Sequence, residues 1–139
     1  MSGDPIDWRA LFASPEGRCP RGRFWFAVAA LFVLAAIYEV VFGPTLKLVT
    51  FWIVYPALLA SAACVIAKRL HDRGRSGWWA ALVLLGVALM WRAPSAARLL
   101  LAAPIMIWSV VELGLLSGEE GANRFGPSPT AGQGVTYAD

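Results

Sequence analysis

The stretch that decides how this chain is organised is Lys68-Arg69-Leu70-His71-Asp72-Arg73-Gly74-Arg75-Ser76-Gly77-Trp78-Trp79. It gathers four cations, one acid and the only histidine of the chain, and apolar runs lead into it and away from it. A basic segment between two apolar runs is typical of a loop at the cytoplasmic face of a membrane. We therefore expect a polar loop that joins two transmembrane helices.

The composition of the whole chain agrees with this interpretation. Of its 139 residues, 58% are apolar and 15% are charged, whereas soluble domains carry about 25% charged residues. The apolar residues form continuous runs, and the cations gather at the ends of those runs, where they suit lipid headgroups better than nucleic acid. The sequence thus predicts a single-domain integral membrane protein with membrane lipid, and no nucleic acid, as its partner.

The first half of the chain contains a short amphipathic segment and two spans. Residues 4–12 predict a short helix on the membrane surface, begun by Asp4 and Pro5. Residues 24–42 and 48–67 are apolar and long enough to cross a bilayer. Gly43 and Pro44 are expected to end the first span, and Thr45 to Lys47 to form a tight external turn.

The second half allows two topologies. Residues 99–116 form a full-length span, whereas residues 78–91 are short, at roughly 20 Å if helical. Tryptophans at both ends of the short run favour a crossing, since local thinning of the bilayer can cover the shortfall. We expect an all-α, small polytopic membrane helix bundle with four spans over residues 24–116. Three spans remain the alternative. Residues 1–23 form an N-terminal cytoplasmic segment, and residues 117–139 form a polar tail whose last ten residues are disordered.

The orientation follows from the positive charges. Four cations precede the first span: Arg9, Arg18, Arg21 and Arg23. Four follow the second span: Lys68, Arg69, Arg73 and Arg75. Between the two spans stands a single lysine, Lys47. The N-terminus and the central loop are therefore both expected on the cytoplasmic side of the membrane.

Three motifs carry a resemblance to a known family. They are Gly17-Arg18-Cys19-Pro20-Arg21-Gly22-Arg23-Phe24-Trp25, Arg69-Leu70-His71-Asp72-Arg73-Gly74-Arg75-Ser76-Gly77-Trp78-Trp79, and Gly118-Glu119-Glu120-Gly121-Ala122-Asn123-Arg124-Phe125-Gly126-Pro127. Together they resemble the bacterial domain-of-unknown-function family 805, the YhaH- and YhaI-like inner-membrane proteins. The resemblance implies an inner-membrane location and no particular activity.

The chemistry-bearing residues do not form a recognisable catalytic set. His71 and Asp72 are adjacent, but neighbours on a helix do not face each other, and one His with one Asp is too few ligands for zinc. Cys19 and Cys64 form no CxxC pair. The arginines around Cys19 could lower its pKa, although an inert thiol is the favoured interpretation. We expect no enzyme activity, no metal and no cofactor.

The four-span topology brings the three motifs to one face and predicts a polar cap there. Its expected members are Arg18, Arg21, His71, Asp72, Asn123 and Arg124, with Arg69 and Arg75 available for lipid phosphates. Glu112 would lie one turn below and pair with Lys68 or Arg69. This cap is the candidate site for a headgroup or a protein partner.

Three functions fit these features. The favoured one is a non-catalytic membrane interaction or envelope-associated module that binds lipid and either a protein partner or further copies of itself. The first alternative is a small transporter or channel component, suggested by Glu39 and Glu112 within apolar runs. The second is a lipid-acting membrane enzyme that uses His71 and Asp72.

Overall fold

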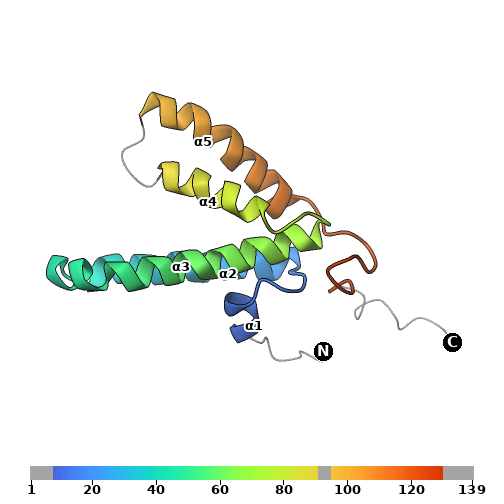
Figure 1. Ribbon diagram of the computed structural model, residues 1–139, viewed down its shortest axis with the longest axis horizontal. Helices are drawn as coiled ribbons and strands as arrows, with labels where there is room; N and C mark the ends of the chain where they lie inside the picture. Colours follow the sequence, from blue (N-terminus) through green and yellow to red (C-terminus); the bar gives the residue numbers. More distant parts are fainter. Residues whose placement is uncertain (1–7, 91–94, 130–139) are drawn as a thin grey trace.

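The computed structural model describes residues 8–90 and 95–129, and its regular elements are all helices. They are α1 (Trp8–Ala13), α2 (Arg21–Val41), α3 (Pro44–Asp72), α4 (Trp79–Met90), α5 (Ala96–Ser109) and the π-helix η1 (Val110–Leu115). Helices α2 and α3 form one hairpin and α4 and α5 a second, and the hairpins meet at one end and diverge at the other (Figure 1). The π-helix continues α5 and packs against α2 and α3 at the shared end.

Three helical stretches are long and apolar enough to cross a membrane: Arg21–Val41, Pro44–Asp72 and Ala96–Leu115. Much of their surface is exposed apolar side chain, with Val40 84% exposed and Leu100 77% exposed. Apolar faces of this extent are unfavourable in water and ordinary in lipid. The prediction of an all-α, small membrane bundle is therefore confirmed. Helix α4, with 12 residues, is roughly 18 Å long and is the shorter apolar helix that the sequence predicted.

Proline at the start of α3 explains one incorrect prediction. Residues 45–47 were expected to form a turn, but they belong to the first turn of α3, and Pro44 occupies one of its first two positions. Proline is favoured there because its fixed φ suits a helix and its missing N–H would be unpaired anyway. Only Phe42 and Gly43 separate α2 from α3.

The C-terminal end of α3 explains a second incorrect prediction. The polar loop was expected to begin at Lys68, directly after the span over residues 48–67, but α3 continues through Asp72. The first part of the central signature is therefore helix, and the loop to α4 is only residues 73–78. Polar residues persist in this last turn because their side chains find partners on other elements, as described below.

The buried core lies at the end where the hairpins meet. Its apolar residues come from α1, the segment before α2, α2 itself, α3, α4 and η1, and they include Leu11, Cys19, Phe24, Ala27, Val65, Leu70, Val83 and Leu113. The short N-terminal helix is confirmed over Trp8–Ala13, and it packs against α3. Asp4 and Pro5, which were predicted to begin it, lie outside the described residues, as do the last ten residues of the tail.

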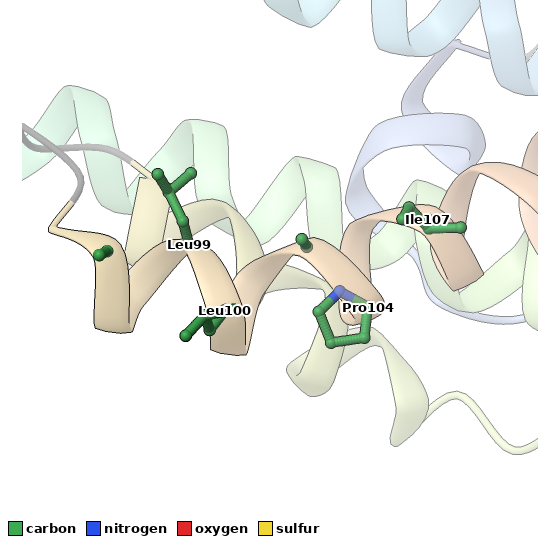
Figure 2. Close-up of a pocket in the computed structure, with 6 residues that line it drawn as sticks. Leu99, Leu100, Pro104 and Ile107 are labelled. Atoms are coloured by element: carbon green, nitrogen blue, oxygen red, sulfur yellow. The ribbon is translucent and has the colours of Figure 1, made fainter.

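Helix α5 turns an apolar stripe away from the core. Ala96, Leu99, Leu100, Ala103, Pro104 and Ile107 recur at helical spacing and line a shallow open hollow on this one helix. Figure 2 shows the labelled side chains Leu99, Leu100, Pro104 and Ile107 distributed along α5. A stripe of this kind suits contact with lipid chains.

Candidate functional site

Asp72 stands at the centre of a buried ion cluster. Its side chain is 3% exposed, and Oδ1 accepts a hydrogen bond from Arg18 Nε at 3.0 Å. Oδ2 accepts one from Arg69 Nη1, one helical turn earlier, at 2.5 Å. Both guanidinium side chains are as deeply buried as the carboxylate. A buried carboxylate needs such partners, because its desolvation is otherwise unfavourable by several kcal/mol.

Arg18 joins the N-terminal segment to the C-terminal segment. Besides Asp72, it donates to the carbonyl oxygens of Gly121 at 2.6 Å and Glu119 at 2.5 Å. The backbone N–H of Glu119 in turn donates to the Asp72 carbonyl oxygen at 2.8 Å. Gly118 lies so close to the Asp72 carboxylate that a side chain at this position would collide with it. The C-terminal motif therefore needs glycine where it crosses the end of α3.

Arg69 caps the end of η1. Its guanidinium donates to the carbonyl oxygens of Leu113 at 2.8 Å, Leu116 at 2.5 Å and Cys19 at 3.3 Å. The last carbonyl groups of a helix lack partners within it and carry partial negative charge. Arg21 supports the same end by donating to the Leu115 carbonyl oxygen at 3.1 Å. These contacts explain why a buried cation tolerates the interior of this bundle.

His71 is held by two other segments of the chain, the one before α2 and the one after η1. Its Nδ1 lies 3.3 Å from the Gly17 carbonyl oxygen, and its ring stacks on Phe125 with 3.9 Å between centroids and 9° between planes. Asn123 Nδ2 donates to the His71 carbonyl oxygen at 2.9 Å. The Arg124 guanidinium lies 4.6 Å from the centre of the Phe125 ring on the same turn of chain. His71 thus acts in this arrangement as a packed aromatic ring with a fixed hydrogen bond.

Glu112 forms a second ion cluster, and the prediction for its partners is wrong. Its Oε1 lies 2.6 Å from Arg75 Nε and 3.4 Å from Arg73 Nε, not beside Lys68 or Arg69. The reason is the extended α3, which places Lys68 on the side of α1, where it donates to the Ala10 carbonyl oxygen. The carboxylate of the π-helix therefore fixes the loop between α3 and α4.

Burial has a larger effect than the neighbouring charges on the pKa of the Cys19 thiol. The side chain is 1% exposed, and this burial raises the pKa of the thiol to about 11, an increase that the nearby Arg69 charge only partly offsets. The suggestion that arginines lower its pKa is wrong for this reason. Cys19 is consequently an unreactive core residue.

The predicted cap residues lie together at this end of the bundle. The contacts above join the N-terminal segment, the end of α3 and residues 118–126, and they involve Arg18, Arg69, His71, Asp72, Asn123 and Arg124. Arg21 caps η1 beside them, and Arg75 is paired with Glu112. We call the set of Arg18, Arg69, His71, Asp72, Glu119, Asn123 and Phe125 the polar cap. Within the described residues, no three His, Cys, Asp or Glu side chains are placed to hold a metal ion.

Three contributors were not singled out from the sequence. Glu119 accepts from Asn123 Nδ2 at 2.9 Å through its Oε2, Phe125 stacks on His71, and Arg73 contacts Glu112 and the Ser117 carbonyl oxygen. Glu119 and Phe125 lie within the C-terminal motif and Arg73 within the central one, so the motifs themselves were the available signal.

Comparison with known proteins gives a consistent result. The family model described as "Protein of unknown function (DUF805)" matches residues 12–127. The uncharacterized protein YiiR of Escherichia coli strain K12 is 31% identical over 122 residues, which cover 80% of this chain and 82% of YiiR. The YiiR protein of E. coli O157:H7 gives the same figures. No solved structure matches the chain significantly.

Proposed function

This chain belongs to the DUF805 family, and from that premise we propose that it is a non-catalytic interaction module of the bacterial inner membrane. In this proposal the polar cap lies on the cytoplasmic side and holds the two hairpins together. The basic surface around it then contacts a partner protein or anionic headgroups. The observation that carries the proposal is that both carboxylate oxygens of Asp72, at the centre of the cap, are bound by buried arginines.

The contacts of His71 and Asp72 argue against catalysis. A general base must reach its substrate through a free ring nitrogen or carboxylate oxygen. Both Asp72 oxygens accept from buried arginines, and His71 Nδ1 lies at the Gly17 carbonyl oxygen rather than at Asp72, so the two residues do not form a catalytic His–Asp pair. These contacts favour a structural role over that of a lipid-acting enzyme.

The two membrane acids argue against a transport path. Glu39 pairs with Lys47 at 2.7 Å and accepts from the Tyr55 hydroxyl, at the end far from the cap. Glu112 pairs with Arg73 and Arg75 at the cap end. A channel needs several polar groups facing one axis, whereas these acids are neutralised separately at opposite ends.

The surface around the cap has the charge that an acidic partner requires. Exposed cations among the described residues of this end are Arg9, Arg21, Arg23, Arg75 and Arg124, and exposed acids are Glu16, Glu119 and Glu120. The excess of cations suits anionic lipid headgroups or an acidic protein surface. It also agrees with a cytoplasmic location under the positive-inside rule.

Site-directed photo-crosslinking in intact cells tests the proposal. A photoreactive residue at Glu120 or Arg23, both exposed at the cap end, is expected to capture one defined protein or lipid adduct. The matched control is Leu48, which is exposed at the opposite end. Equal adducts at all three positions would contradict a specific surface at the cap.

A second experiment separates this function from the alternatives. The expected outcome for His71→Ala is a loss of protein level or thermal stability that accounts for any phenotype. A distinct phenotype with normal protein level would favour the lipid-acting enzyme. Solute flux through vesicles containing the purified protein, abolished by Glu112→Gln, would favour the transporter.

A further inference from the structure

The divergence of the two hairpins leaves a cleft between them. Figure 1 shows α4 and α5 leaning away from α3 as they leave the cap. The cleft has a volume of about 510 Å³, and residues that line it include Phe51, Tyr55 and Leu59 of α3, Val87 and Leu89 of α4, and Arg98 of α5. Its volume falls within the range of about 300–1,000 Å³ found for small-molecule sites.

The walls of the cleft suit a hydrocarbon chain. They are aromatic and aliphatic side chains from two helices that both run through the apolar part of the bundle. The cleft is open on one side, so an elongated ligand can enter laterally from the bilayer. The cleft is wide because the hairpins meet at the core of the cap end and diverge away from it (Figure 1).

One cation stands against these apolar walls. Arg98 lies in the first turn of α5, where its backbone N–H donates to the capping Ser95 Oγ at 3.4 Å. Arg98 is exposed, and its guanidinium forms no hydrogen bond or ion pair with another described residue. A cation at the N-terminal end of a helix opposes the helix dipole. The stability of α5 therefore does not explain this arginine.

Glu39, the acid bound by Tyr55 of the cleft wall, is paired with another cation. Tyr55, which lines the cleft, donates its hydroxyl proton to Glu39. Glu39 is already paired with Lys47, whose Nζ also donates to the Glu39 carbonyl oxygen. The wall of the cleft is consequently apolar with one uncompensated positive charge at the level of a helix end.

We propose that this cleft binds a phospholipid with an anionic headgroup, its acyl chain lying between α3 and α4 and its phosphate bound by Arg98. The pairing of an apolar slot with a single cation at the depth of a membrane interface matches the two ends of such a lipid. The site is at the end opposite the polar cap and does not depend on the function proposed for that cap.

Native mass spectrometry of the purified protein tests the site. The protein, released from detergent after incubation with equal amounts of phosphatidylglycerol and phosphatidylcholine, is expected to retain phosphatidylglycerol preferentially. Arg98→Gln is expected to lower that preference about tenfold, the effect of losing one charge-assisted contact. Arg98→Lys should restore part of it. Leu48→Gln, at an exposed position of α3 that does not line the cleft, should leave the preference unchanged.

A variant that fills the cleft tests the position of the acyl chain. Val87→Phe is expected to reduce retention of both lipids while the melting temperature stays close to that of the wild type. If Val87→Phe alters folding, Leu59→Phe on the facing helix gives the same test. An unchanged headgroup preference in Arg98→Gln would overturn the proposal. A dimer that dissociates when the cleft is filled would also overturn it, because the occupant would then be a second copy of the chain.

Discussion

At the scale of single residues, the charge balance around Asp72 explains which groups the arginines of the polar cap contact. Two buried guanidinium groups share one carboxylate, which leaves one positive charge in excess. Six carbonyl oxygens receive further N–H groups of the two arginines, those of Gly121, Gly126, Glu119, Leu113, Leu116 and Cys19. The excess charge is thus spread over backbone dipoles, including the negative end of η1.

Removing the carboxylate should therefore be severe. Asp72→Ala leaves both arginines buried without a counter-ion, and breaking a buried pair in this way lowers stability by about 3–5 kcal/mol. We expect a large drop in the melting temperature in detergent and lower accumulation in the membrane. Glu120→Ala, at an exposed position of the same segment, is the control and should change neither. A melting temperature for Asp72→Ala equal to that of the wild type would show that the cluster is dispensable.

The thiol of Cys19 gives a prediction about pH. Because its pKa in the folded protein is about 11, it should react slowly with iodoacetamide up to about pH 9 and faster as the pH approaches 11. The unfolded chain, with the ordinary thiol pKa of 9.0, should react rapidly from about pH 9 upward. Alkylation rates in a Cys64→Ala background, with and without denaturing detergent, measure this difference. Equal rates in both states would contradict the burial of Cys19.

The same shift makes the free energy of unfolding depend on pH. A thiol with a raised pKa in the folded state contributes stability that is fully present below the unfolded pKa. That contribution is lost as the pH rises from about 9 to 11, because only the unfolded state then releases its proton. Two pKa units correspond to roughly 2.7 kcal/mol, so Cys19→Ala should flatten stability over this range of pH.

At the scale of elements, the contact between η1 and α2 depends on one glycine. Trp25 of α2 donates its indole N–H to the Gly114 carbonyl oxygen at 3.2 Å, and a Cβ at Gly114 would lie 2.6 Å from the indole ring. Gly114→Ala should thus force the ring away and lower stability by about 1–3 kcal/mol.

A double variant checks this mechanism. If the loss comes from the indole, Gly114→Ala combined with Trp25→Ala should be little worse than Trp25→Ala alone. Gly22→Ala, where a new Cβ meets nothing within 4 Å, is the matched control and should be neutral or slightly stabilising. Thermal unfolding followed by circular dichroism measures all four proteins. Strictly additive losses would place the defect in the backbone of η1 instead.

The sequence predicts these elements well where hydropathy decides them and poorly where tertiary contacts do. The apolar runs located α2, α3, α4 and α5 because lipid requires long apolar helices. The polarity of Lys68 to Asp72 suggested a loop, yet the segment is helical because Arg69 and Asp72 meet one turn apart. The π-helix had no local signal, since its end is stabilised by Arg21, Arg69 and Trp25 from other helices. The predicted partners of Glu112 were wrong for the same reason, because they depend on where α3 ends.

At the scale of the whole molecule, the polar cap constrains how the chain crosses the membrane. Arg18, before α2, is hydrogen-bonded to Gly121, after η1. Hydrogen-bonded groups cannot lie on opposite sides of a bilayer, so the segments before α2 and after η1 must share one side. The number of crossings must then be even. Because α2 and α3 form one hairpin, the pair formed by α4 and α5 must also leave and return to that side.

Reporter fusions test this topology. We expect alkaline phosphatase fused after Asp139 to be inactive and green fluorescent protein at the same position to fluoresce, because four spans that begin in the cytoplasm, as we propose, would return the tail to it. Phosphatase inserted at Gly43, between α2 and α3, should be active. An active phosphatase after Asp139 would mean three spans, and the contact between Arg18 and Gly121 would then have no place in the membrane-bound protein. The short α4 is the critical element: at roughly 18 Å it requires local thinning of the bilayer to match a hydrocarbon core of about 30 Å.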